Sequence, residues 1–313
     1  HCASVRVQNE AMSAAKPVRR VTIADIARMY EEGERFATIT AYDYPTARIV
    51  DAAGIPLILV GDSLGMVMLG YDTTVRVNID EMLHHTRAVA RGAKRALVVG
   101  DMPFLTYGVS TEESLEHAGR FLSEAYAQAV KIEGGVRSAR TMEAIVNSGI
   151  PVMGHIGLTP QAVNQLGGHR VQGKTRESAR SLIADALAVQ EAGAFAVVLE
   201  LVPAELAGAI TERLSIPTVG IGSGPYTSAE IQVVTDVVGL TQGFVPRHAR
   251  HFGEVGEALA EAVRAYRDAV ESGDFPAEAE SSSMEQSVLD EVLGRSELDQ
   301  AATPTSIPLD RDL

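Results

Sequence analysis

The chain of 313 residues is short of cysteine, basic side chains and long apolar runs, and each shortage excludes a class of protein. Its one cysteine is Cys2, so no disulfide framework, cysteine-bound metal or core thiol nucleophile is expected. The 27 Lys and Arg face 41 Asp and Glu, and the net charge of −14 argues against nucleic acid or an anionic membrane as partner. The longest apolar runs are strand-length, so no membrane span is expected. These absences favour a reducing, cytoplasmic location.

Short runs rich in Val, Ile and Leu alternate with helical patterns along most of the chain, and no Asn-Gly or Asp-Gly hairpin signal lies between them. Nearly unbroken apolar strands are typical of a parallel sheet that is buried on both faces. The pattern therefore predicts a (β/α)₈ TIM barrel, with a doubly wound open sheet as the alternative. The predicted strands cover residues 36–41, 56–61, 96–100, 129–132, 151–155, 195–201, 217–221 and 236–238. A helix is predicted at 228–234, and the last barrel helix at 254–271.

The chain divides into three predicted segments. Residues 1–20 are expected to be a flexible N-terminal segment, and residues 21–272 the barrel, with a helix at 21–31 before its first strand. Residues 273–313 form an acidic tail rich in Ser and Ala, which is expected to be disordered. The tail holds one helical patch, at 284–293, which could dock on its own domain or on a partner.

Five of the predicted strands end at a polar or charged residue that is costly to bury without a partner. These residues are Asp62, Asp101, Glu133, His155 and Glu200. Parallel strands of a barrel deliver their last side chains to one common face, where barrel enzymes build their active sites. The series therefore predicts an active site at this face.

Asp62, Asp101 and Glu133 close consecutive strands, so their carboxylates can converge. Carboxylates held together repel one another unless a cation joins them, and a hard divalent ion such as Mg²⁺ suits oxygen ligands. We therefore expect Asp62, Asp101 and Glu133 to be metal-associated acids. The alternative is that they cap helices or pair with Arg and Lys around the rim.

Lys131 and Glu133 alternate along one strand, so both should point into the barrel. A buried lysine requires an anion, and a substrate carboxylate is a natural partner, with Ser63 as a second donor. An ion pair of Lys131 with Glu133 or Asp101 is the alternative. Glu200 lies among apolar residues and could be a general base or a buried structural acid. His155 could orient substrate from behind the site or be a satisfied core histidine.

Eight stretches of the chain carry a resemblance to one enzyme family, and they occur in that family's order between Thr40 and Gly224. They are TAYDYPTARI, LVGDSLGM, GDMPF, VKIEGG, GHIGLTPQ, VNQLGGHRVQG, LELVPAEL and IPTVGIGSG. In these motifs the chain closely resembles the ketopantoate hydroxymethyltransferase family, and general similarity extends over residues 21–271. The motifs are long and together very specific.

The resemblance implies a Mg²⁺-dependent (β/α)₈ barrel, usually a homodecamer. It implies transfer of a hydroxymethyl group from 5,10-methylenetetrahydrofolate to 3-methyl-2-oxobutanoate, giving 2-dehydropantoate through a Mg²⁺-stabilised enolate, in the first committed step of pantothenate biosynthesis. Folate should lie over the barrel mouth, near the glycine-rich loops. The matching residues imply these roles: Asp62 and Asp101 contact metal and keto acid, Glu133 is the third metal-associated acid, Ser63 and Lys131 bind the substrate carboxylate, and Glu200 accepts the proton.

Two alternatives stay open at this point. One is a Mg²⁺-dependent enzyme of the phosphoenolpyruvate mutase and isocitrate lyase type, although lyases of that group generally need a core cysteine. The other is a non-catalytic binding protein on the same barrel. A scaffold would have no need of Glu200 beside the metal acids.

Overall fold

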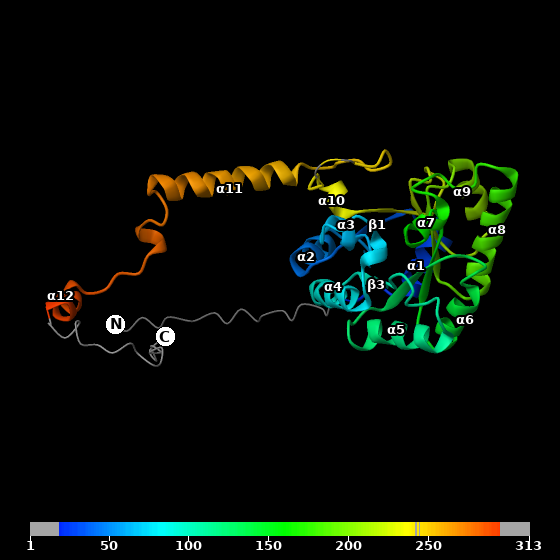
Figure 1. Cartoon of the computed structure of the whole chain (residues 1–313), viewed down its shortest axis with the longest axis horizontal. Coiled ribbons are helices and arrows are strands. Elements are labelled where there is room, and N and C mark those ends of the chain that lie inside the picture. The colour runs from blue at the N-terminus through cyan, green and yellow to red at the C-terminus, as the bar shows by residue number, and fades with distance from the viewer. Residues whose placement is uncertain (1–18, 242, 244, 295–313) are drawn as a thin grey trace, which may run out of the picture. The chain divides into compact units, whose positions relative to one another are not determined.

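The computed structural model describes residues 19–241, 243 and 245–294, and in it eight parallel strands close into one barrel (Figure 1). The strand β1 pairs with both β2 and β8, so the sheet has no free edge and the open-sheet alternative is excluded. The predicted (β/α)₈ fold is confirmed. The strands are β1 (Phe36–Thr40), β2 (Leu57–Val60), β3 (Leu97–Asp101), β4 (Ala129–Glu133), β5 (Val152–Gly157), β6 (Ala196–Glu200), β7 (Thr218–Ile221) and β8 (Ala229–Gln232).

Helices follow the strands, and Figure 1 shows α5, α6 and α8 along the outside of the barrel. The helix α1 precedes β1, as the sequence predicts. The α-helices are α1 (Ile23–Glu31), α2 (Tyr44–Ala52), α3 (Leu64–Val67), α4 (Ile79–Gly92), α5 (Thr111–Ser123), α6 (Ala139–Asn147), α7 (Val163–Leu166), α8 (Arg176–Glu191), α9 (Ala204–Thr211), α10 (Val234–Val237), α11 (Val255–Ser272) and α12 (Gln286–Gly294). Short 3₁₀ turns are η1 (Thr74–Arg76), η2 (Pro160–Ala162) and η3 (Glu278–Glu280).

Side-chain caps fix the start of two barrel helices. Asn78 and Glu81 form a reciprocal capping box at α4, in which each side chain accepts a hydrogen bond from the other's backbone N–H. At α5 the Ser110 hydroxyl accepts a hydrogen bond from the backbone N–H of Glu113 at 3.1 Å. Both helices therefore start directly after a residue whose side chain caps the first turn.

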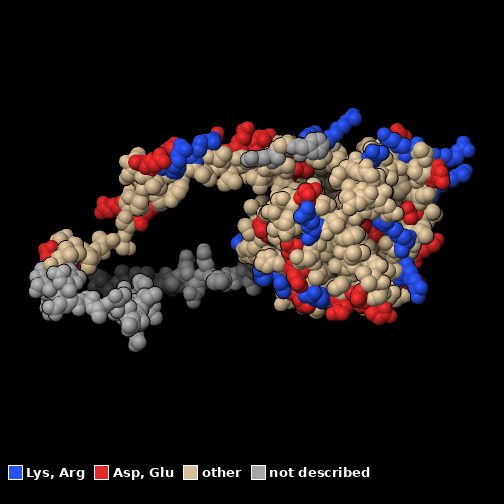
Figure 2. Space-filling model, viewed as in Figure 1, with Lys and Arg blue, Asp and Glu red and all other residues tan. Residues whose placement is uncertain are grey.

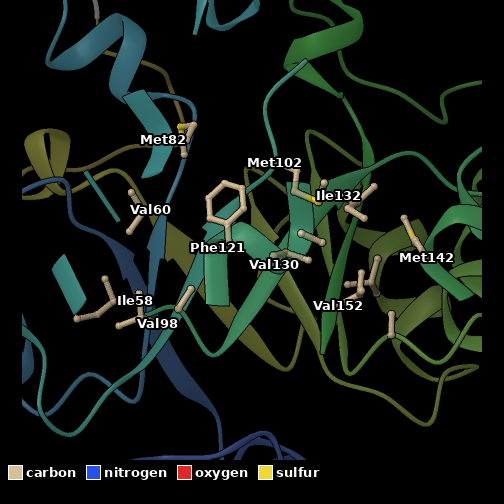
Figure 3. Packing of buried hydrophobic residues seen from close by; sticks show 14 of the residues in the cluster. Ile58, Val60, Met82, Val98, Met102, Phe121, Val130, Ile132, Met142 and Val152 are labelled. Atoms are coloured by element: carbon tan, nitrogen blue, oxygen red, sulfur yellow. The ribbon is translucent and has the colours of Figure 1, made fainter. Parts of the chain in front are cut away.

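Two apolar layers follow from the period of two in the strands. Residues such as Leu57, Leu97 and Ala129 point into the barrel and form the inner layer. Their neighbours Ile58 and Val98 point outward and pack with the helices, as Figure 3 shows. In the outer layer, α5 lies against β3 so closely that a Cβ at position 100 would overlap the ring of Phe121.

The prediction for the eighth strand and the helix before it is wrong. The segment predicted as a helix at 228–234 contains β8, and most of the strand predicted at 236–238 lies in or next to α10. Ala229 and Ile231 are buried inside the barrel, and β8 is held by ladders to both β1 and β7. Pairing with two neighbours fixes this strand, whereas the Val-rich run that follows has only a weak local preference for strand.

The described part of the chain divides into two compact units. Among the described residues, those from 19 to 256 form one compact unit, and those from 257 to 294 belong to a second. The helix α11 forms close to the predicted bounds, but none of its residues is buried. The helix α12 overlaps the patch predicted at 284–293. The boundaries at 20 and 272 stay predictions, and residues 1–18 and 295–313, on which the terminal segments depend, lie outside the described residues.

The structure shows how charged side chains are distributed on one face and whether any described helix could span a membrane. On the face shown in Figure 2, basic and acidic side chains of the barrel unit are interspersed. None of the helices between residues 19 and 294 is long and apolar enough to cross a lipid bilayer.

Candidate active site

The strand register brings four of the five strand-end residues onto the inner face of the barrel. Asp101 lies opposite Lys131 in the β3–β4 ladder, and Glu133 lies opposite His155 in the β4–β5 ladder. Each lies an even number of residues from an apolar residue of the inner layer on its own strand, so its side chain points to the same side. Glu200 ends β6 in the same way. Asp62 lies just beyond β2, next to Asp101, as the contacts below show.

Asp62, Asp101 and Lys131 form a buried group at the ends of β2, β3 and β4. The backbone N–H of Asp62 donates to Asp101 Oδ2 at 3.0 Å, and Lys131 Nζ lies 2.7 Å from Asp101 Oδ1. All three residues are at most 4% exposed. The Lys131–Asp101 ion pair, which the sequence leaves open as a structural alternative, is therefore present.

His155 lies between two glutamates. Its Nδ1 is 3.3 Å from Glu133 Oε1, and its Nε2 is 3.2 Å from Glu200 Oε2. Lys131 Nζ is 3.5 Å from the same Nδ1 and 4.0 Å from Glu133 Oε1. His155 and Glu133 are buried, whereas the side chain of Glu200 is 17% exposed. Of the acids, Glu200 therefore has the most open path to a molecule in the barrel mouth.

Ser63 stands at the start of α3, with its hydroxyl free of any helix-capping bond. Its Oγ is 2.8 Å from the hydroxyl of Tyr42, a fully buried residue after β1. Burial raises the pKa of Tyr42, so the phenol stays protonated and can hold Ser63 in place. The sequence analysis did not single out Tyr42, because only the fold brings it next to Ser63.

The burial of so many charges shifts their protonation. Burial raises the pKa of Asp101 to about 7, against the opposing effect of Lys131, and it also raises the pKa of Asp62. Burial alone would lower the pKa of Lys131, but the surrounding acids outweigh it and raise that pKa. For His155, burial and Lys131 act to lower the pKa, yet hydrogen bonds to Glu133 and Glu200 raise it to about 9. At neutral pH the site therefore contains a protonated lysine and a protonated histidine.

The donor set fits a hard divalent cation that keeps open positions. No three His, Cys, Asp or Glu side chains in the described residues are arranged to enclose a metal ion by themselves. Mg²⁺, however, is usually held by one or two carboxylates together with water and substrate oxygens. Asp62 and Asp101 supply two adjacent carboxylates, because the backbone N–H of Asp62 donates to Asp101 Oδ2.

Two further polar residues of the site were not predicted from the sequence. Gln161, in η2, donates from its side chain to Asp62 Oδ2 at 2.9 Å. Ser223 donates to the carbonyl of Leu199 at 2.7 Å and accepts from the N–H of Val202 at 3.1 Å, so it holds the backbone on either side of Glu200. Both residues lie in recognisable motifs, GHIGLTPQ and IPTVGIGSG, but their contacts are long-range.

A cavity of about 500 Å³ adjoins the acids where the loops after β3, β4 and β5 meet. Glu133 and Gln161 line its inner end. Phe104 and Tyr107 supply aromatic walls, and Arg137 supplies a cation. Arg137 bonds to the amide oxygen of Gln165 at 3.3 Å and makes no ion pair within the described residues.

The closed parallel barrel and the acids at the carboxyl ends of its strands define a (β/α)₈-barrel protein with an enzyme-type site. The particular family follows from comparison of the sequence. Residues 20–278 match the model of the family described as ketopantoate hydroxymethyltransferase, and the chain belongs to this family.

Relatives cover almost the whole barrel. The chain is 59% identical to the 3-methyl-2-oxobutanoate hydroxymethyltransferase of Chloroflexus aurantiacus over 88% of this chain and 97% of that protein. It is 53% identical to the enzyme of that name from Dehalococcoides mccartyi, over 87% of this chain and 98% of that protein. Among solved structures, phosphonopyruvate hydrolase with oxalate and Mg²⁺ is similar at a TM-score of 0.54 with 13% identity, covering 89% of this chain and 96% of that one. That likeness shows the fold alone.

Proposed function

We propose that this chain transfers a hydroxymethyl group from 5,10-methylenetetrahydrofolate to 3-methyl-2-oxobutanoate, forming 2-dehydropantoate in the first committed step of pantothenate biosynthesis. The observation that carries the proposal is the placement of Glu200. It is a partly open carboxylate, held by His155 at 3.2 Å, at the edge of a buried group of acids around Lys131. The names of relatives at 53–59% identity support hydroxymethyl transfer to this keto acid.

The keto acid has a carboxylate next to a ketone, and the site offers donors for the carboxylate. Lys131 is protonated and buried, so an anion beside it forms a charge-assisted hydrogen bond. Ser63, oriented by Tyr42, is the second donor. We assign substrate-carboxylate binding to Lys131 and Ser63. When the substrate binds, it shares Lys131 with Asp101.

A divalent cation, Mg²⁺ in this proposal, would be held by Asp62 and Asp101, with Glu133 as the third associated acid. The charges of the site support a metal of this valence. When Asp62, Asp101, Glu133 and Glu200 are all ionised, they carry two more negative charges than Lys131 and a protonated His155 balance, and a divalent cation would favour that ionised state. When bound, the cation supplies Lewis-acid polarisation of the substrate ketone, which stabilises negative charge that develops on its oxygen.

Glu200 is the general base in this proposal. Its carboxylate takes the proton from C3 of the bound keto acid, and the electron pair of that C–H bond becomes the enolate. The protonated His155 holds the other side of the carboxylate and fixes which oxygen faces the substrate. The enolate carbon then forms a bond to the one-carbon unit of the folate donor, and water supplies the hydroxyl of the product. Both bonds from that carbon to folate nitrogens break, and tetrahydrofolate leaves with two protons, one from Glu200 and one from the water.

The folate donor is proposed to enter through the cavity of about 500 Å³ that ends at Glu133. Phe104 and Tyr107 can pack on a flat heteroaromatic ring, and Arg137 can meet a carboxylate of the folate tail. Replacing Arg137 with Gln should raise the KM for the donor about tenfold or more and leave the KM for the keto acid unchanged. An equal rise in both KM values would refute this placement.

The experiment that tests the function follows the C3 proton of 3-methyl-2-oxobutanoate by NMR in heavy water, with Mg²⁺ or with EDTA. Metal-dependent loss of the signal, followed by 2-dehydropantoate when the folate donor is added, is the expected result. Binding of the keto acid with neither exchange nor turnover, with Mg²⁺, Mn²⁺ and Co²⁺ in turn, would contradict the proposal and favour a binding protein.

The family resemblance also supports a homodecamer, and the single cysteine of the sequence supports a cytoplasmic location. Light scattering of the purified protein tests the assembly, because ten copies of a 33.2 kDa chain differ clearly from one or two. A mass of a monomer or dimer at working concentration would contradict it.

A further inference from the structure

Gln161 touches more of the acidic group than any assigned role explains. The residue is 4% exposed and lies in η2, after β5. Its backbone N–H donates to Glu133 Oε2 at 3.1 Å, and its side-chain Nε2 donates to Asp62 Oδ2 at 2.9 Å. The same Nε2 donates to the carbonyl of Met102, the residue after Asp101, at 3.0 Å. One residue therefore links the ends of β2, β3 and β4.

The amide of Gln161 can make these contacts in one orientation only. Both partners of Nε2 are acceptors, a carboxylate and a carbonyl, so an oxygen in that place would face two oxygens. Oε1 accepts a hydrogen bond from the hydroxyl of Tyr107 at 2.6 Å. Burial, and then the charges of Glu133, Asp101 and Asp62, raise the pKa of Tyr107 well above its ordinary value, so the phenol stays a donor. Tyr107 thus fixes which end of the amide faces Asp62.

The contact has a consequence for the acids. With Oδ2 of Asp62 and Oε2 of Glu133 each committed to Gln161, rotation of either carboxylate would break a buried hydrogen bond. The second oxygen of each acid is then held in a defined direction. An amide does this without neutralising the acids, whereas a basic side chain in the same place would compete with a bound cation.

We propose that Gln161 is a positioning residue that aims Asp62 and Glu133 at the cation and the keto acid, and that Tyr107 sets its orientation. The inference rests on the proposed function, because it presumes that these acids hold a divalent cation. Partners that orient metal ligands typically change metal affinity by 10- to 100-fold when they are removed. A residue that only anchors the η2 turn would change thermal stability and leave metal affinity as it was.

The test measures Mn²⁺ affinity of the metal-free protein by electron paramagnetic resonance, together with kcat and KM for C3 exchange and the melting temperature. Gln161→Met keeps the volume but removes all three hydrogen bonds of the side-chain amide, to Asp62, Met102 and Tyr107. The backbone N–H of residue 161 can still donate to Glu133. We expect it to weaken Mn²⁺ binding roughly 10- to 100-fold and to lower kcat for exchange. Tyr107→Phe keeps the ring and should weaken Mn²⁺ binding in the same direction by a smaller factor.

Gln190→Met is the matched control. Gln190, in α8, accepts a hydrogen bond from the backbone N–H of Ser215, before β7 and away from the acids. The Gln190→Met substitution should lower the melting temperature. It should leave the Mn²⁺ affinity within about twofold of the wild type, because Gln190 contacts no metal-associated acid.

The outcomes separate the two proposals. If the wild type binds Mn²⁺ and exchanges the C3 proton while Gln161→Met and Tyr107→Phe match its affinity, the positioning role is overturned and the proposed function stands. If the wild type itself neither binds Mn²⁺ nor exchanges, the proposed function fails and the positioning role fails with it. If Gln161→Met does not fold, Tyr107→Phe alone decides, because loss of one hydroxyl leaves the packing of the loop in place.

Discussion

The protonated state of His155 makes a quantitative prediction about stability without metal. The pKa of this buried imidazole is raised from its ordinary 6.5 to about 9, because the hydrogen bonds to Glu133 and Glu200 outweigh burial. The folded protein therefore binds the proton more tightly than the unfolded chain. Its contribution to stability is complete below pH 6.5 and is lost as the pH rises through 9. At about 1.4 kcal/mol for each pKa unit, roughly 3 kcal/mol should disappear across this range.

Asp101 and Lys131 titrate outside the upper part of this window. The raised pKa of Asp101 also makes stability fall with rising pH, but that loss is complete near pH 7. The raised pKa of Lys131 acts only in strongly alkaline solution. Between pH 7 and 9.5 the fall in the free energy of unfolding should therefore come mainly from His155.

Urea denaturation in EDTA at pH 6.5, 7.5, 8.5 and 9.5, at one protein concentration, measures the effect. His155→Gln is the control, because an amide can still bond to one glutamate but cannot titrate. The wild type should lose roughly 3 kcal/mol over this range, and the variant should lose less than half as much. A wild type that is flat within about 1 kcal/mol, or a variant with the same slope as the wild type, would refute the assignment of a charged histidine.

Three further predictions follow from single residues. Glu200→Gln keeps the size of the side chain and a hydrogen-bond acceptor for His155, but the amide cannot take a proton. The C3 exchange rate should therefore fall about 10²- to 10⁴-fold, while the keto-acid affinity measured by calorimetry is retained. An unchanged exchange rate would show that Glu200 is not the base. The pKa of Asp101 is about 7, so Mg²⁺ must displace a proton from this residue at lower pH. As the pH is raised toward 7, the Mg²⁺ affinity measured by calorimetry should increase up to about tenfold per pH unit, and above pH 7 it should level off. An affinity that does not depend on pH would show that Asp101 loses no proton on binding. Phe121→Ala empties the contact between α5 and β3 and should cost about 3–5 kcal/mol in urea denaturation; a cost below 1 kcal/mol would mean that this layer repacks freely.

The convergence of the strand-end residues could be predicted from the sequence because it depends only on local information. A short apolar run marks a strand, and the period of two decides which side chains share a face. Lys131 and Glu133 on β4 show this: both are buried on the inner side, and Ile132 between them packs in the outer layer. The roles assigned to these residues came from the family motifs, and they stay proposals.

Contacts that depend on the closed barrel could not be predicted in this way. The place of β8 depends on pairing with β1, almost 200 residues earlier in the chain, and local preference pointed to the wrong segment. Gln161 reaches Asp62, and Tyr107 reaches Gln161, from loops after different strands. Loop conformation decides such contacts, and the sequence carries no periodic signal for it. Gln161 lies in the motif GHIGLTPQ and Tyr107 lies outside the quoted motifs, and neither position indicates what the side chain contacts.

The burial of the site explains why its parts depend on one another. Asp62, Asp101 and Glu133 are each at most 4% exposed, and desolvation of such groups is costly unless charges and hydrogen bonds compensate. Lys131 compensates part of this cost, and Gln161 offers hydrogen bonds to two of the acids without adding charge. The uncompensated negative charge is what a divalent cation would bind. A second lysine in place of Gln161 would stabilise the metal-free fold at the expense of that affinity. The neutral amide therefore leaves the site stable enough to fold and still negative enough to hold a cation.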